Sequence, residues 1–128
     1  MSEPYVKDEY PLSHVTARII AAAKEVYGTL GPGFRELIYQ RALALELPAH
    51  GLEFSREVWI DVYYKDQKVG RHRVDFMVDE VMVEIKAKAT LDAVDFMQTL
   101  SYLKASGCKV GLLLNLGGKT LEIRRLAN

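Results

Sequence analysis

A change of hydrophobic period in the middle of the chain most constrains the fold. Between residues 14 and 50, apolar side chains recur at helical spacing, which predicts helices. From residue 57 the sequence EVWIDVYY carries an aliphatic residue at every second position, which predicts a strand. The chain must therefore pack helices against a sheet within 128 residues, a length that suits one domain with one hydrophobic core.

Short polar connections join the strands that follow. We expect strands at about residues 57–64, 69–78 and 81–87, separated by the polar turns KDQK (65–68) and DE (79–80). Connections this short fit hairpins and are too short for parallel crossovers. The three strands therefore predict an antiparallel meander.

Helices are expected on both sides of the meander. Ser13 is a candidate N-cap for a helix over 14–29, a second helix fits 34–50 with Gly51 as its C-terminal cap, and a third fits 92–105. The apolar stripe expected for the second helix consists of Leu37, Ile38, Ala42, Leu45 and Ala49. These helices would supply the layers that cover the sheet.

The end of the chain predicts two more strands. The run KVGLLLNL (109–116) is almost continuously apolar, as expected of a strand buried on both faces, and Gly117-Gly118 turns the chain into a last strand at 119–125. The predicted order is ααβββαββ, an α/β (α+β) fold. Residues 1–12 are expected to form an irregular lead-in, and residues 13–128 a single domain.

Composition excludes several classes of protein. The 17 basic and 17 acidic residues cancel, which argues against binding to nucleic acid through bulk charge. No apolar run approaches the roughly 20 residues of a membrane span, and the N-terminus lacks the pattern of a secretory signal. A single cysteine, Cys108, excludes an internal disulfide framework, so we expect a cytoplasmic protein.

A neutral total can still hide local basic surface. Residues 65–73 contain four basic residues against one acidic residue, Asp66. Charges scattered for solubility are the alternative explanation. Trp59 and Tyr63, on the preceding strand, could stack with bases, although packing in the core or at an interface is the favoured explanation.

Strand alternation gathers three charged residues of the meander. Glu84 and Lys86 must project from the same face of their strand, and Asp75 shares a face with Arg73 on the strand before, while His72 projects from the other face. If residues 79 and 80 form the turn, Asp75 falls directly opposite Glu84, with Cβ atoms about 4.5–5.5 Å apart.

Like charges placed directly opposite each other destabilise a sheet, so something should offset this repulsion. A divalent cation is one candidate. The alternatives are ion pairs of the two acids with Lys86 and Arg73, or a proton shared by the two carboxyl groups. The divalent cation is the explanation that gives all three residues a function. In metal-assisted phosphodiester hydrolysis, carboxylates hold Mg²⁺ and an ammonium orients water or stabilises the transition state.

Several motifs carry a resemblance to a known family. Asp75 followed by Glu84-Ile85-Lys86 resembles the D…(D/E)-x-K signature of the PD-(D/E)XK nuclease superfamily, with Val74 where the signature has proline. The segment GFRELIY (33–39) resembles the motif that names the GxxExxY family within that superfamily. QTLSYLK (98–104) and GLLLNLG (111–117) are similar to the family's following helix and strand. The similarity spans roughly residues 13–127.

The resemblance implies a restriction-endonuclease-like mixed sheet flanked by helices. It implies that Asp75, Glu84 and Glu36 surround Mg²⁺, with Mn²⁺ as a substitute, and that Lys86 is the catalytic lysine. Gln98 would face the same site from the later helix. The implied activity is hydrolysis of DNA or RNA, and the alternative is a catalytically inactive nucleic-acid-binding or protein-interaction module of the same fold.

Further residues are expected to contact nucleic acid. Arg71 and Arg73 share the face of Asp75 and could reach phosphate, although salt bridges to the acids would also account for them. By resemblance, Tyr39 and Tyr102 would border the site. A domain of this size could form a homodimer to widen its contact with nucleic acid.

Overall fold

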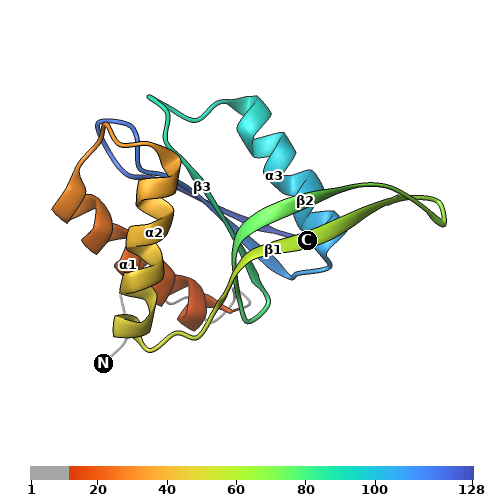
Figure 1. Cartoon of the computed structure of the whole chain (residues 1–128), viewed down its shortest axis with the longest axis horizontal. Helices are drawn as coiled ribbons and strands as arrows, with labels where there is room; N and C mark the ends of the chain where they lie inside the picture. Colours follow the sequence, from red (N-terminus) through yellow and green to blue (C-terminus); the bar gives the residue numbers. More distant parts are fainter. Residues whose placement is uncertain (1–11) are drawn as a thin grey trace.

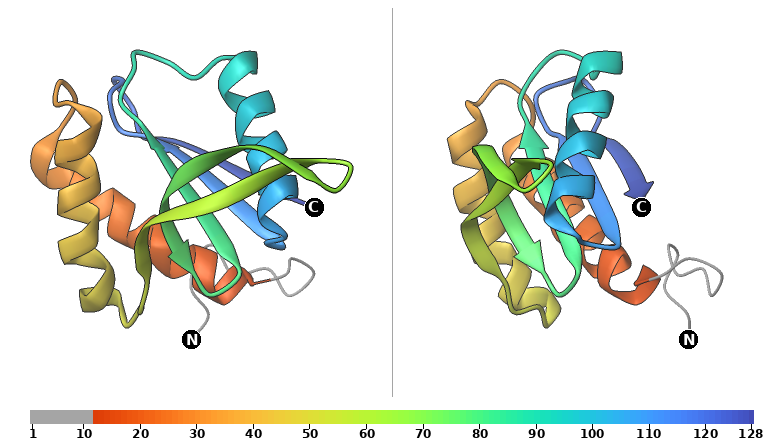
Figure 2. Two further views of the ribbon diagram at one scale, coloured as in Figure 1. Left: turned by 45° about the vertical axis from the view of Figure 1, so that its right-hand side comes forward. Right: turned by 90° about the vertical axis from the view of Figure 1, so that its right-hand side faces the viewer.

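The computed structural model describes residues 12–128, and within them a mixed five-stranded sheet carries helices on both faces (Figures 1 and 2). The elements are α1 Ser13–Leu30, α2 Glu36–Glu46, a 3-10 turn at Leu47–His50, β1 Ser55–Tyr64, β2 Gln67–Val78, β3 Val81–Lys86, α3 Ala93–Ser106, β4 Val110–Asn115 and β5 Glu122–Ala127. The expected order ααβββαββ and the mixed α+β fold are confirmed. All of the expected lead-in except residue 12 lies outside the described residues.

The sheet combines a meander with one crossover. Its strand order is β1-β2-β3-β4-β5, and β1, β2 and β3 are antiparallel neighbours, as expected from their short turns. β3 and β4 are parallel because α3 carries the chain across the sheet between them, and β5 returns antiparallel to β4. Every residue of β4 is buried, which confirms the expectation from its continuous apolar sequence.

Each face of the sheet has its own hydrophobic core. On one face, α1 and α2 pack against apolar residues of β2, β3 and β4, including Phe76 and Val83. On the other face, α3 contributes Leu103, which packs with Met82 and Leu113. The sheet is therefore packed on both faces, with the two cores on opposite sides of it.

Two details of the helices differ from the expectation. Ser13 is the first residue of α1 and is buried, while Leu12 precedes it in a left-handed conformation without a side-chain cap, so the N-cap prediction was wrong. The stripe predicted for α2 was also wrong, because Leu37 and Leu45 are exposed. The buried face instead carries Tyr39, Gln40 and Leu43, which turns a tyrosine and a glutamine toward the sheet.

A polar network holds the connection between β3 and α3 against the end of β4. Asn115, although fully buried, accepts a hydrogen bond from the backbone N–H of Lys88 and donates to its carbonyl, at 3.0 and 2.9 Å. The Lys88 ammonium pairs with Asp95, 2.7 Å away, and Asp95 forms a capping box with Asp92 at the start of α3. This network fixes the direction in which the chain leaves β3, two residues after Lys86.

Gly117, which follows β4, lies against the backbone of the connection between β3 and α3. We therefore expect position 117 to require glycine. A Cβ atom there would lie 2.5 Å from backbone atoms of Ala87 and Lys88. We expect Gly117→Ala to lower the free energy of unfolding by about 1–3 kcal/mol, the usual cost of overpacking. Urea unfolding followed by circular dichroism would measure this cost.

Gly28→Ala is the matched control for this substitution. Gly28 lies in α1, and nothing surrounds its Cβ position within 4 Å. Alanine should stabilise that helix by about 0.5–1 kcal/mol relative to glycine. Equal stability of Gly117→Ala and the wild type would show that the connection after β3 moves aside at little cost, and would contradict the requirement for glycine.

Candidate active site

The site forms where β2 separates from β3. The expected pairing of Val78 with Val81 is confirmed, and the ladder continues only as far as Phe76 and Val83. The expected pair of Asp75 with Glu84 does not form, because Asp75, the next residue of β2, lies beyond the last pair. Beyond this point β2 continues with β1 into a hairpin that projects from the rest of the molecule (Figures 1 and 2).

The ladder between β1 and β2 is interrupted at the same place. β1 pairs with β2 at Phe76 and at Val74, but Glu57, which faces Asp75 between these pairs, is not paired. Glu57 has a φ of 55°, a left-handed conformation that costs energy for a residue with a side chain. The backbone of Asp75 is therefore released from pairing with both neighbouring strands.

The faces of β2 exchange at Asp75. Phe76 packs in the core beneath α1 and α2, as alternation predicts from Val83 opposite. Val74, two residues earlier, packs instead with Met82 and Leu103 in the core beneath α3. Simple alternation, which places residues i and i+2 on one face, therefore does not hold across Asp75.

This exchange corrects the expectation for His72. Alternation placed His72 away from the acids, but its Nε2 lies 2.7 Å from Oε1 of Glu84. Its ring stacks on Tyr102 of α3, with ring centroids 3.7 Å apart and an interplanar angle of 5°. The expected placement was wrong because it carried the register of residues 76–78 through the twist at Asp75.

Hydrogen bonds hold both carboxylate oxygens of Asp75. Gln40 of α2 donates to Oδ1 at 2.7 Å, and the backbone N–H of Ile85 donates to Oδ2 at 2.8 Å. The Arg56 guanidinium donates twice to Oε1 of Gln40, at 3.1 and 2.9 Å, and so fixes the orientation of the amide. Gln40 and Arg56 were missed from the sequence, where only the position of Gln40 directly after Tyr39 hints at a role.

Glu84 is buried beside Asp75, and its pKa is strongly perturbed. Burial raises the pKa of Glu84 to about 9, with further contributions from the charge of Asp75 and a hydrogen bond between the two side chains. Lys86 lowers this pKa, and Glu36 raises it. Burial also lowers the pKa of His72. The two carboxyl groups thus converge as expected, and without a cation they hold a proton at neutral pH.

The loop before α2 delivers Glu36 to this cluster. Tyr39 donates its hydroxyl hydrogen to the carbonyl of Gly31 at 2.7 Å and accepts from the backbone N–H of Phe34 at 3.2 Å. Gly33 has a φ of 106°, which glycine adopts without strain. In the GxxExxY segment, glycine and tyrosine therefore shape the loop. Glu36, the first residue of α2, supplies the carboxyl group of this segment.

A pocket of about 280 Å³ opens at the acidic cluster. Glu36, Leu37 and Gln40 line it from α2, and Arg73 and Asp75 line it from β2. Partial burial in this pocket raises the pKa of Glu36, and the charge of Asp75 raises it further. Glu36 is thus the accessible member of the cluster and the one best placed to exchange a proton with solvent.

The other expected site residues differ in their burial and in their contacts with the acidic cluster. Tyr39 is fully buried, so the structure gives it a role in the core and not at a nucleic-acid surface. Tyr102 borders the site through His72. Gln98 is exposed on α3, one turn before Tyr102, and its side chain makes no hydrogen bond within residues 12–128. The structure does not bring its amide into contact with Asp75 or Glu84.

Arg71 and Arg73 lie on the hairpin. The Arg73 guanidinium is 3.1 Å from Glu57 and also lines the pocket. The Arg71 guanidinium lies over the Trp59 ring, 3.9 Å from its centroid. Ion pairs to Asp75 or Glu84, the alternative account of these arginines, do not form.

The oxygen donors fit a hard divalent cation. Mg²⁺ is usually held by one or two carboxylates with water and substrate phosphate completing its shell, and Asp75 and Glu84 provide such a pair. Within residues 12–128, no group of three or more histidine, cysteine or acidic side chains could hold a metal ion, so Asp75, Glu84 and Glu36 do not together form the expected set of three ligands. A cation here would therefore depend on water or a phosphate for its remaining ligands.

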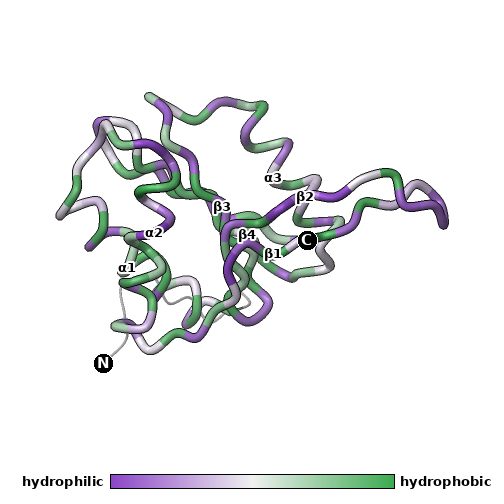
Figure 3. The backbone as a smooth tube through the Cα atoms, viewed as in Figure 1, coloured by the Kyte–Doolittle hydropathy of each residue, from purple (hydrophilic) through white to green (hydrophobic). Residues whose placement is uncertain are grey.

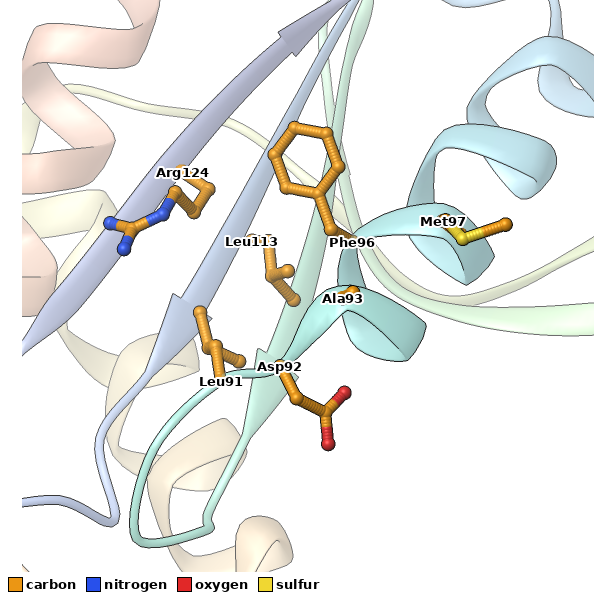
Figure 4. Close-up of a pocket in the computed structure, with 7 residues that line it drawn as sticks. All are labelled: Leu91, Asp92, Ala93, Phe96, Met97, Leu113 and Arg124. Atoms are coloured by element: carbon orange, nitrogen blue, oxygen red, sulfur yellow. The ribbon is translucent and has the colours of Figure 1, made fainter.

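A second pocket, of about 360 Å³, has a different character. Leu91, Phe96, Met97 and Leu113 line it between the start of α3 and the last two strands, together with Arg124 (Figure 4). None of the acids of the candidate site lines this apolar pocket. It is thus separate from the chemistry at Asp75.

The raised pKa of Glu84 predicts a pH-dependent stability. Above pH 4.5 the unfolded chain releases the Glu84 proton, while the folded chain keeps it until about pH 9. The contribution of Glu84 to stability is therefore lost as pH rises through this window. We expect Glu84→Gln, measured in EDTA, to have a Tm that exceeds the wild-type Tm by an amount that grows from pH 5 to pH 9.

Glu25→Gln is the control, because Glu25 is exposed on α1. Its Tm difference from the wild type should stay nearly constant over the same range. A constant difference for Glu84→Gln as well would contradict the burial of a protonated Glu84.

Comparison with known proteins identifies one family. The family model described as the PD-(D/E)XK nuclease superfamily matches residues 13–126. No curated protein matches the chain in sequence. The crystal structure of SSO0001 is similar, with 14% identity and a TM-score of 0.49 over 89% of this chain. This chain spans 65% of the length of SSO0001. Because the family model covers nearly all of residues 13–128, the chain belongs to the PD-(D/E)XK nuclease superfamily.

Proposed function

We propose that this chain is a Mg²⁺-dependent nuclease that hydrolyses phosphodiester bonds of DNA or RNA. Mn²⁺ would substitute for Mg²⁺. The observation that carries the proposal is the convergence of Asp75, Glu84, Lys86 and Glu36 at the point where β2 separates from β3. The GxxExxY segment of α2 supports the narrower assignment to the GxxExxY family.

Asp75 and Glu84 would hold the cation. When bound, Mg²⁺ supplies Lewis-acid chemistry, since it polarises the scissile phosphate and lowers the pKa of bound water. Gln40 and the backbone N–H of Ile85 keep Asp75 oriented while leaving lone pairs on both of its oxygens. A cation would also replace the proton that relieves the repulsion between the two carboxyl groups.

Lys86 and Glu36 would act on the substrate and the attacking water. Lys86 lowers the pKa of Glu84, so its ammonium lies close enough to the acids to stabilise negative charge that develops on the phosphate. Glu36, whose pKa is raised and which lines the open pocket, can accept a proton from water. Gln98 would join this machinery only through a movement of its exposed side chain.

The substrate is expected to reach the pocket along the hairpin. Arg73 lines the pocket and Arg71 lies farther out on β2, so both are candidates to contact phosphate. No helix within residues 12–128 is long and apolar enough to cross a membrane. A cytoplasmic location and a homodimer both stay predictions.

One observation favours the alternative of a catalytically inactive binding module. Within the described residues, the acids do not form a cage of three or more metal-ligating side chains. A module of this kind would use the pocket to bind nucleic acid or a protein without turnover. Measured cleavage distinguishes it from the proposed nuclease.

The proposed activity predicts a loss of cleavage in two variants. With Mg²⁺ or Mn²⁺, the wild type should nick plasmid DNA or cleave single-stranded DNA or RNA. Glu84→Ala and Lys86→Ala should each reduce the cleavage rate by at least about a hundredfold, the scale on which electrostatic groups contribute to catalysis.

Lys104→Ala is the matched control, because Lys104 is an exposed lysine on α3, and its rate should equal that of the wild type. Cleavage that survives both Glu84→Ala and Lys86→Ala would exclude this site. Absence of cleavage on every substrate would favour the binding module.

Metal binding has a test that does not depend on activity. Mg²⁺ at a hundredfold excess over its Kd should stabilise the folded wild type by about 2.7 kcal/mol, which a rise in Tm would report. Because the ionised form of Glu84 is needed, this rise should be larger at pH 8 than at pH 6. Glu84→Gln should lose it, while Glu25→Gln should keep it. An equal rise in Glu84→Gln would place the cation elsewhere.

A further inference from the structure

The outer part of the β1–β2 hairpin contributes to neither hydrophobic core. Ile60 and His72 are the last facing pair that reaches α3, through the core beneath it and through the ring of Tyr102. Beyond them the strands project into solvent, and Figure 3 shows a hydrophilic tip at the turn. The residues exposed there are therefore not explained by folding.

Large aromatic side chains lie at the base of this segment and on it, since Trp59 comes one residue before the Ile60–His72 pair and Tyr63 lies beyond it. Trp59 is 50% exposed and Tyr63 is 60% exposed, and alternation places both on the same face of β1. The cross-strand partner of Trp59 is Arg73, and Arg71 is the next residue of β2 on that face. We call this face, defined by Trp59, Tyr63, Arg71 and Arg73, the hairpin ridge.

The two arginine side chains of the hairpin ridge lie over the ring of Trp59. The Arg71 guanidinium lies 3.9 Å from the centroid of the Trp59 ring, and that of Arg73 lies 5.8 Å from it. Within residues 12–128, no carboxylate pairs with Arg71. A cationic group fixed over an exposed indole offers one group for a phosphate and one flat surface for a base.

The hairpin ridge is continuous with the pocket at the acids. Arg73 both faces Trp59 across the two strands and lines the pocket together with Glu36 and Asp75. A strand of nucleic acid that lies along the hairpin ridge would therefore lead its next phosphate toward Asp75. The order along this path is tip, Arg71 with Trp59, Arg73, and then the acidic cluster.

We propose that the hairpin ridge binds single-stranded nucleic acid, with one base stacked on Trp59 and flanking phosphates on Arg71 and Arg73. A duplex offers phosphates but keeps its base faces stacked on each other, so it would leave the indole unused. A second copy of this chain fits poorly, because a two-fold contact between identical ridges would bring Arg71 near its own copy. This proposal rests on the proposed function for the direction of the strand, but binding itself does not require cleavage.

Trp59 is the only tryptophan of the chain, so its fluorescence reports directly on the hairpin ridge. In EDTA, where cleavage is suppressed, a short oligothymidylate and the matching oligouridylate should quench the emission of the full-length wild type. A blunt duplex of the same length should bind more weakly and quench less. Equal quenching by the duplex, or no change of emission with either single strand, would overturn the proposal.

Substitutions test the same surface by anisotropy of a fluorescein-labelled oligothymidylate. Trp59→Ala and Arg71→Ala should each weaken binding by about tenfold, the scale of one base–aromatic stack. Trp59→Phe should recover part of the loss, because phenylalanine keeps a stacking face. The controls Phe96→Ala on α3 and Arg124→Ala on β5, at the opposite edge of the sheet, should bind like the wild type.

The outcomes separate this proposal from the proposed activity. Binding that depends on Trp59, in a protein that cleaves nothing, would support the hairpin ridge and contradict the nuclease. If the wild type cleaves nucleic acid and Trp59→Ala keeps the same KM and rate, this would support the nuclease and contradict the hairpin ridge. If sedimentation shows a dimer that Trp59→Ala dissociates, while oligonucleotides leave the emission unchanged, the ridge is a self-association surface and the proposal is overturned.

Discussion

The close approach of two carboxyl groups, Asp75 and Glu84, is the constraint on which the arrangement of the site depends. Burial, together with the charge of Asp75, raises the pKa of Glu84 to about 9. Hydrogen bonds from Gln40 and the Ile85 backbone hold Asp75 in place, and His72 lies against Glu84. These groups come from α2, β2 and β3, so the arrangement exists only in the folded protein. Holding two buried carboxyl groups together costs stability, a cost that proteins commonly bear at functional sites.

The twist of β2 makes this approach possible. A regular ladder through Asp75 would place its side chain at a fixed position on one face, with its backbone bonded to β1 and β3. Interruption of both ladders instead lets the carboxylate turn toward α2 and accept the Ile85 N–H. The left-handed conformation of Glu57, opposite Asp75, is a local cost that the two packed cores offset.

Much of this architecture could be predicted from the sequence, because period and turn length are local properties. The order of elements, the meander and the buried β4 all follow from such patterns. The site was predicted less completely. Register brought Asp75 near Glu84, but no local pattern reveals a twist at one residue, and His72 was therefore assigned to the wrong face. Gln40 was missed because a buried glutamine finds its partner 35 residues away, across the fold.

Packing separates the aromatic residues that the fold explains from those that it does not. Tyr39 is fully buried and holds the loop before α2, so packing and two hydrogen bonds account for it. Trp59 is different, because half of its surface is exposed and it belongs to neither core, although its neighbour Ile60 packs beneath α3. A large exposed indole covered by one arginine gains little for folding, whereas it suits a flat ligand that carries negative charge. Trp59 lies directly across from Arg73, which lines the acidic pocket, so one arginine connects the exposed indole with Asp75 and Glu36.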